Sequence, residues 1–264
     1  MKYQLDNGFI EYDFIGKGIP LLFIHGYPLS RRIWDPQMKG LSERVSLISV
    51  DLRGHGESYP FVGPYTMDLL ADDCRRLLDD LDIKPPIVAC GLSMGGYVTM
   101  ALFRKYPNLF KGMILTSTRP GPDSPEAKAN RDAAIRNVQD NGVAFIAENM
   151  LPKMVSLVTF SSKPNLVNSI RDIMMETSVQ GVVGALQGMR DRPDSRPLLH
   201  QIKCPALIIH GADDQLIPLH EAELMHQQIP NSRFVVIPEA GHLPNLEQPD
   251  EFNQAMRDFI LSLP

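Results

Sequence analysis

Short runs of hydrophobic residues recur along the chain, and most of them end at a glycine or a polar residue. Strands that are buried on both faces of a parallel sheet show this pattern, because neither face meets water. The runs that predict such strands are Pro20–Ile24, Val45–Val50, Ile87–Cys90, Met113–Leu115, Ala206–Ile209 and Phe234–Ile237. Two alternating stretches before them, Tyr3–Leu5 and Phe9–Phe14, flank an Asn-Gly pair and predict an antiparallel hairpin.

Segments with hydrophobic residues at helical spacing lie between these runs. Met67–Leu81 is the clearest case, since its leucines recur on one helical face and acids and arginines occupy the other. The same interpretation applies to Met94–Tyr106, Leu219–Ile229 and Glu251–Leu261. Strands that alternate with helices are typical of βαβ units, so the sequence predicts an α/β fold with a mostly parallel sheet flanked by helices.

One region breaks the alternation, because residues 119–196 contain helical patterns such as Glu126–Val138 and Val143–Met150 but no convincing strand. Proline-rich and glycine-rich turns lie at both of its ends. We therefore predict a catalytic domain formed by residues 1–118 and 197–264, with a helical insertion at 119–196. The insertion contains Met150, Met154, Met174, Met175 and Met189, which either line a lid or pack between its helices.

The segment Gly91–Gly96 (GLSMGG) lies between a predicted strand and a predicted helix. A serine in a G-x-S-x-G turn at such a junction has its hydroxyl lifted above the sheet edge, next to the N-terminus of the helix. The positive end of that helix favours negative charge at the reacting centre. Ser93 is therefore the predicted nucleophile.

A serine nucleophile needs a base, and a base needs an acid that orients it. His242 follows the last predicted strand, at the sheet edge where ligands of such folds bind, and it is the predicted base. Asp213 and Asp214 follow the preceding strand. As neighbours, their side chains point in different directions, so only one of them can face His242, and the spacing alone leaves both open.

Attack of a serine on a carbonyl group places a negative charge on the carbonyl oxygen, and backbone N–H donors are needed to stabilise this oxyanion. One is the N–H of Met94, directly after the serine, and the other is the N–H of Tyr27 in the loop after the first buried strand, where Pro28 has no N–H to offer. The residues that we assign to the substrate pocket are His25, Trp34, Met150 and Leu243. Core packing is the alternative interpretation of Trp34.

Composition narrows the function classes. The chain has 264 residues, of which 44% are hydrophobic and 22% charged, and its net charge is -5, which argues against nucleic acid or an anionic membrane surface as a partner. We find no signal peptide and no hydrophobic run long enough to span a membrane, so we expect a cytoplasmic protein. Cys74, Cys90 and Cys204 form no metal-type pair and are expected to be small buried hydrophobes.

Several motifs together resemble the α/β-hydrolase superfamily, and they occur in its order: His25–Pro28, Asp51–Ser58, Gly91–Gly96, Gly211–Asp214 and Gly241–His242. Within it, the chain resembles small bacterial carboxylesterases, which are related to 3-oxoadipate enol-lactonases and cofactor-free haloperoxidases. The resemblance implies an eight-stranded sheet, a helical cap after the sixth strand, and no metal or organic cofactor. It also places the acid at the fourth residue of a Gly-x-x-Asp turn, which is Asp214.

The expected activity is hydrolysis of short- to medium-chain carboxylic esters through an acyl-enzyme, with a small-molecule ester as the partner. A lactonase of the 3-oxoadipate enol-lactone type uses the same residues and stays open. A ligand-binding protein on a hydrolase scaffold is a third hypothesis, although a pure binder needs neither a base nor an orienting acid. Dehalogenation is not expected, because the similar haloalkane dehalogenases carry an aspartate where this chain has Ser93.

Overall fold

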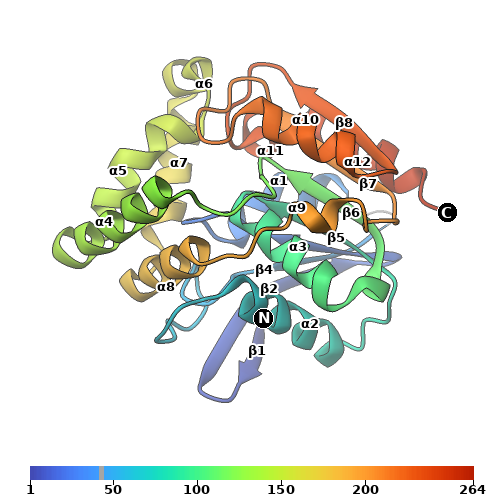
Figure 1. Cartoon of the computed structure of the whole chain (residues 1–264), viewed down its shortest axis with the longest axis horizontal. Helices are drawn as coiled ribbons and strands as arrows, with labels where there is room; N and C mark the ends of the chain where they lie inside the picture. The colour runs from blue at the N-terminus through green and yellow to red at the C-terminus, as the bar shows by residue number, and fades with distance from the viewer. Residues whose placement is uncertain (42–44) are drawn as a thin grey trace.

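A twisted eight-stranded sheet forms the centre of the computed structural model, which describes residues 1–41 and 45–264 (Figure 1). The strand order is β1-β2-β4-β3-β5-β6-β7-β8. The strands are β1 (Lys2–Leu5), β2 (Gly8–Gly16), β3 (Ile19–Ile24), β4 (Val45–Val50), β5 (Ile87–Leu92), β6 (Phe110–Thr116), β7 (Ala206–Gly211) and β8 (Ser232–Ile237).

The strand directions confirm the predicted sheet. β1 pairs antiparallel with β2 across the Asn7-Gly8 turn, and β2 pairs antiparallel with β4. The pairs from β4 through β8 are parallel. The carboxyl ends of β5, β7 and β8 therefore share one edge of the sheet, and the loops that follow these strands can meet there.

Helices cover both faces of the sheet. On one face, α2 (Met67–Asp80), α3 (Met94–Lys105) and α10 (Leu219–Gln228) share a hydrophobic core with Leu22 and Ile24 of β3. On the other, η1 (Arg31–Trp34), α1 (Asp35–Gly40), α11 (Pro244–Glu247) and α12 (Pro249–Leu261) share a second core with Leu21 and Phe23. The alternation along β3 follows from the two-residue repeat of a strand, and it explains why the run is hydrophobic throughout.

A block of helices separates β6 from β7, within the region where the sequence predicts an insertion after the sixth strand. It stands to one side of the sheet in Figure 1, where it is coloured from light green to orange. Its helices are α4 (Pro125–Asn141), α5 (Val143–Met154), α6 (Leu157–Ser162), α7 (Pro164–Met175) and α8 (Val179–Arg190); the short α9 (Arg196–Leu199) then leads into β7. We call residues 119–196 the helical segment.

One expectation about the strands is wrong. The last hydrophobic run, 234–237, was expected to be buried on both faces, but Phe234 and Val235 are half-buried and Val236 is exposed. β8 has these exposures because it is an edge strand, with a neighbour on one side only.

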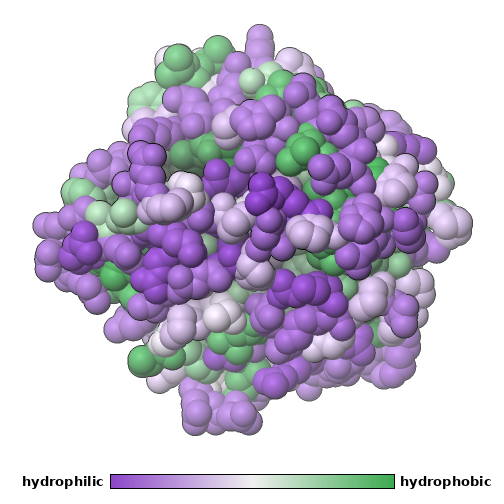
Figure 2. Space-filling model, viewed as in Figure 1, coloured by the Kyte–Doolittle hydropathy of each residue, from purple (hydrophilic) through white to green (hydrophobic). Residues whose placement is uncertain are grey.

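The molecular surface in Figure 2 is mostly hydrophilic, with scattered hydrophobic patches; one of them lies over α6, where Leu157, Val158 and Phe160 are exposed. Within the described residues, no helix combines the length and the hydrophobicity that crossing a bilayer requires.

Candidate active site

Ser93 occupies a strained turn between β5 and α3. Its φ of 54° lies in a region that non-glycine residues rarely adopt, and the surrounding packing enforces it. A Cβ on Gly91 would lie 2.2 Å from the Gly95 carbonyl oxygen, and one on Gly95 would lie 2.1 Å from that of Ile24. Both glycines are therefore required by close backbone contacts, and the sharp turn that they permit places Ser93 at the sheet edge.

His242 and Asp214 are joined by a hydrogen bond of 2.8 Å between Nδ1 of the imidazole and Oδ2 of the carboxylate. The other carboxylate oxygen of Asp214 accepts the backbone N–H groups of Leu216 and Ile217, at 2.8 and 3.0 Å. Burial by itself would raise the pKa of Asp214, but His242 and these donors hold it below its usual value. Asp214 is thus an ionised acceptor that fixes which imidazole nitrogen carries the proton.

Asp213, the neighbour that the spacing left open, is exposed, whereas the side chain of Asp214 is 1% exposed. His210 approaches the same carboxylate, but its Nε2 lies 2.9 Å from the Ile217 carbonyl oxygen, and burial lowers its pKa. This geometry favours Asp214 over Asp213 as the partner of His242.

The two predicted oxyanion donors flank Ser93. Met94 begins α3, so its N–H has no partner within the helix. Gly26, next to Tyr27, lies against the nucleophile loop, since a Cβ there would come within 3.2 Å of the Ser93 Cβ. Across the described residues, neither the Tyr27 N–H nor the Met94 N–H donates to another backbone carbonyl. The role of these two N–H groups as oxyanion donors stays a prediction.

Ser93 and His242 line the same cavity, which has a volume of about 180 Å³. The sequence had placed Met150 there, and it does line this cavity. The other lining residues are Tyr27, Tyr97, Arg119, Arg131, Met189, Leu216 and Ile217. Side chains of the sheet loops and of the helical segment therefore enclose the nucleophile together.

Three residues assigned to the pocket from sequence are placed elsewhere. Trp34 is fully buried and stacks on Phe23 at a centroid distance of 4.7 Å, in the core between the sheet and α12. Leu243 is fully buried in the same core. His25 is also fully buried, and its Nε2 accepts the Leu52 N–H at 3.0 Å, which braces two loops below the site. None of the three lines the cavity of Ser93, so their assignment to the pocket is corrected.

Glu247 is a residue that the sequence analysis missed. Its fully buried carboxylate accepts the N–H of Gly241 at 2.8 Å and that of Ser156, in the helical segment, at 2.8 Å. The His242 N–H in turn donates to the Met154 carbonyl oxygen at 3.0 Å. Glu247 therefore ties the loop of His242 to the helical segment. Polar residues such as Asn245 and Gln248 flank Glu247, and Asp250 and Glu251 follow it closely, so no local sequence pattern singles it out.

Arg119 and Arg131 were also missed. Arg119 comes shortly after β6, at the edge of the sheet where ligands bind, so its position was a usable signal. Arg131 lies on α4, and nothing in the sequence separates it from Arg136, the other arginine of that helix. No group of three metal-binding side chains is present in residues 1–41 and 45–264.

The fold is shared with known proteins. A family model described as the alpha/beta hydrolase fold matches residues 19–249. A thermophilic esterase from Thermogutta terrifontis is 42% identical, with a TM-score of 0.95, and the match covers 97% of this chain and 94% of that one. A bromoperoxidase from Bacillus anthracis is 25% identical, with a TM-score of 0.87, and the match covers 97% and 96%.

Among curated relatives, 3-oxoadipate enol-lactonase 2 from Acinetobacter baylyi is 29% identical over 236 residues, which are 89% of this chain and 86% of the relative. The chain is thus similar to the groups of proteins that its motifs indicated, and that resemblance is confirmed.

Proposed function

The chain belongs to the α/β-hydrolase family, and from this premise we propose that it is a serine carboxylesterase with Ser93, Asp214 and His242 as its catalytic triad. The observation that carries the proposal is the hydrogen bond between His242 Nδ1 and Asp214 Oδ2, because His242 lines the same cavity as Ser93. A binding protein has no need of a base held in one tautomer beside a strained serine.

In the proposed reaction, His242 takes the hydroxyl proton of Ser93 while the serine oxygen attacks the ester carbonyl. The N–H groups of Tyr27 and Met94 stabilise the oxyanion, and each such donor is worth about 2.7–4 kcal/mol in the transition state. His242 then gives its proton to the departing alcohol, so that the C–O bond of the ester breaks and an acyl-serine remains. His242 then takes a proton from a water molecule as the water oxygen attacks the acyl-serine. The bond between the acyl carbon and the Ser93 oxygen breaks, His242 returns the proton to this oxygen, and the acid leaves.

The helical segment acts as a cap in this proposal. Arg131, Met150 and Met189 line the cavity from above the sheet edge. A cavity of about 180 Å³ fits short or medium acyl groups, and the substrate is a small-molecule ester. All steps use side chains and backbone of the chain itself, and none calls for a metal or an organic cofactor.

The test is hydrolysis of p-nitrophenyl esters of increasing acyl length by wild type and by Ser93→Ala. Wild type is expected to turn over the shorter esters, and the variant to lose about 10⁶-fold in kcat, because the nucleophile is the residue on which the triad acts. Ser162→Ala, an exposed serine at the end of α6, serves as the matched control. Hydrolysis that survives in Ser93→Ala would remove the assignment.

A lactonase is the second candidate, favoured by the similarity to 3-oxoadipate enol-lactonase 2. The same attack opens a cyclic ester, and the leaving alcohol then stays attached to the acyl group. A panel of lactones and open-chain esters of matched size distinguishes the two activities through their kcat/KM values. Tight binding of such compounds without turnover would favour a ligand-binding protein.

A further inference from the structure

Two arginine side chains line the cavity of Ser93 and His242 although ester hydrolysis gives them no task. Arg119 comes shortly after β6, and Arg131 projects from α4. A neutral ester needs a nucleophile, a base and oxyanion donors, but no guanidinium group. Partly buried charges are costly unless they are compensated, so their presence beside a nucleophile calls for a partner.

One buried carboxylate holds both of these arginines and a third. Asp123 accepts from Arg119 Nη2 at 3.3 Å, from Arg192 Nη1 at 2.6 Å and from Arg131 Nε. Burial would raise the pKa of Asp123, but Arg131 and Arg192 hold it below its usual value, so it is ionised at neutral pH. Asp123 therefore balances one of three guanidinium charges.

The carboxylate of Glu221, half-buried on α10, also attracts Arg119. Even when Asp123 and Glu221 are both counted against the three guanidinium groups, a surplus of positive charge remains.

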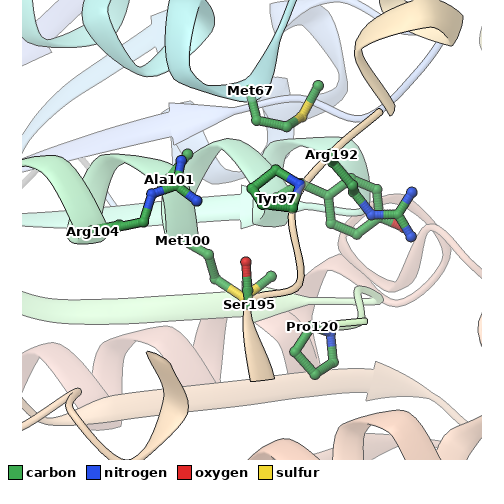
Figure 3. Close-up of a pocket in the computed structure, with 9 residues that line it drawn as sticks. Met67, Tyr97, Met100, Ala101, Arg104, Pro120, Arg192 and Ser195 are labelled. Carbon is green, nitrogen blue, oxygen red and sulfur yellow. The ribbon is translucent and has the colours of Figure 1, made fainter. Parts of the chain in front are cut away.

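Arg192 is already fully engaged. It is buried, it donates to the carbonyl oxygens of Gly121 and Met189, and its guanidinium lies 4.2 Å from the centre of the Tyr97 ring. Figure 3 shows Arg192 beside Tyr97 in a small pocket that Met100 and Ala101 of α3 also line. Arg192 thus supports the wall of the Ser93 cavity, and Arg119 and Arg131 are the arginines that face into it.

Two donors in this cavity lack acceptors. Arg119 Nε and the Tyr27 hydroxyl are buried and have no hydrogen-bond partner in the described part of the chain. The two residues line the same cavity as Ser93. Leaving a buried donor without an acceptor is unfavourable, so a ligand that brings acceptor atoms to these two donors gains binding free energy.

A second, larger cavity adjoins the first. It has a volume of about 660 Å³ and is lined mainly by α4 and α5. Tyr27, Arg131, Met150 and Leu216 line both cavities, so Arg131 stands where they meet. A substrate that extends from Ser93 toward the helical segment therefore passes this guanidinium group.

We propose that Arg119 and Arg131 form a subsite for a carboxylate, so that the preferred substrates are monoesters of dicarboxylic acids. The proposal rests on the proposed function, because the scissile carbonyl has to lie at Ser93. The free carboxylate neutralises the surplus charge and supplies acceptors to Arg119 Nε and the Tyr27 hydroxyl. Guanidinium groups pair with carboxylates through two parallel hydrogen bonds, which adds orientation to attraction.

The test compares methyl pentanoate with monomethyl glutarate, in which a carboxylate replaces the terminal methyl group. Released methanol gives kcat/KM for each. Monomethyl glutarate, or its succinate or adipate counterpart, is expected to be preferred by wild type about 10- to 100-fold, as for hydrogen bonds to charged groups. Arg119→Gln and Arg131→Gln should lower this preference at least tenfold, mainly through KM. Arg136→Gln, an exposed arginine on α4, is the matched control and should keep it.

Two results would overturn the subsite: a wild-type preference for methyl pentanoate over all three monoesters, or a preference that Arg119→Gln and Arg131→Gln leave unchanged. Circular dichroism checks the fold of each variant. If a glutamine variant does not fold, the lysine variant at that position replaces it. It keeps the charge but loses the two-pronged geometry, so it should lower the preference by a smaller factor, and an unchanged preference counts against the subsite.

Calorimetric binding of monomethyl glutarate to Ser93→Ala separates this proposal from the proposed function. Binding that Arg119→Gln weakens at least tenfold supports the subsite even if wild type hydrolyses no ester, in which case the proposed function fails alone. Hydrolysis of p-nitrophenyl esters by wild type, with no binding of the monoester to Ser93→Ala, removes the subsite alone.

Discussion

The loops at the edge of the sheet and the helical segment enclose the same cavity in different ways. The sheet loops contribute Ser93 and His242, whose positions are set by close glycine contacts and by the bond to Asp214. The helical segment contributes Arg131, Met150 and Met189 from helix faces, where many residue types would fit. In the proposed function, the reaction depends on the strained loops, whereas the choice of substrate depends on a packed surface that can vary without disturbing them.

The largest effect that separates the two regions is expected at Asp214. Asp214→Asn keeps the shape of the side chain but removes the charge that orients His242, and it should lower kcat by about 10⁴-fold. Asp213→Asn, the exposed neighbour, is the matched control and should behave as wild type. Steady-state kinetics on one p-nitrophenyl ester decide the matter, and similar losses in both variants would contradict the assignment.

The stability of the protein in acid tests the loop after β4. This loop contacts the start of α8, since the Ser178 N–H donates to the Gly54 carbonyl oxygen. His55 in this loop is fully buried, and burial lowers its pKa from 6.5 to about 4. At pH values between these two, the imidazole of His55 binds a proton in the unfolded chain but not in the folded chain. The contribution of the neutral His55 to the free energy of unfolding is therefore fully present above pH 6.5. It is lost as the pH falls toward 4, by about 3 kcal/mol in total.

His55→Asn should reduce this acid-induced loss by about 2–3 kcal/mol, measured as the difference between free energies of unfolding in urea at pH 7 and pH 4.5. The ring of His25, also fully buried, lies 5.0 Å from that of His55, and its pKa is lowered mainly by burial, so it keeps contributing to the acid-induced loss in both proteins. His220→Asn, at an exposed histidine, should leave the difference as it is. Equal acid sensitivity of wild type and His55→Asn would show that the buried imidazole does not control it.

Glu247 joins the two regions, so its removal tests whether the position of His242 depends on the helical segment. Glu247→Gln places an amide where the N–H groups of Gly241 and Ser156 need an acceptor. A shift of the loop by about 1 Å lowers catalysis about 10²-fold, and we expect the loss in kcat with little change in KM. Glu251→Gln, an exposed acid on α12, is the control. A loss of stability with kcat unchanged would show a structural role alone.

The smallest effect is expected within the helical segment. Met150 lines both cavities, so Met150→Ala enlarges the space beside Ser93. The acyl-length preference should shift toward longer p-nitrophenyl esters by about tenfold in relative kcat/KM, which corresponds to burial of one or two methylene groups. Met175→Ala, an exposed methionine of α7, should keep the wild-type profile. An unchanged profile in Met150→Ala would place the acyl chain elsewhere.

Much of the fold and of the reacting centre could be predicted, because each strand and each catalytic loop carries a local signature. The hydrophobic runs ended close to the strand ends, and the turn around Ser93 has a residue pattern set by its own backbone. Asp214 was harder, because two adjacent aspartates differ in burial rather than in spacing, and only packing distinguishes them.

The rest depends on contacts between distant segments. Trp34 lies shortly after the oxyanion loop in sequence, but it packs on Phe23 and Phe252 beneath the sheet. Glu247 is defined by its bond to Ser156, 91 residues away, and the cluster around Asp123 brings together Arg119, Arg131 and Arg192 across most of the helical segment. Local patterns carry no information about such partners, which explains why the pocket lining was mostly missed.

The most direct measurement of the central claim is covalent labelling of the nucleophile. A p-nitrophenyl alkylphosphonate transfers its phosphonyl group to an activated serine and releases p-nitrophenol, and the adduct resembles the tetrahedral intermediate. Peptide mass spectrometry after inactivation should find one phosphonyl group per chain, on Ser93, and none in Ser93→Ala. A label on another residue, or equal labelling of Ser93→Ala, would contradict the account.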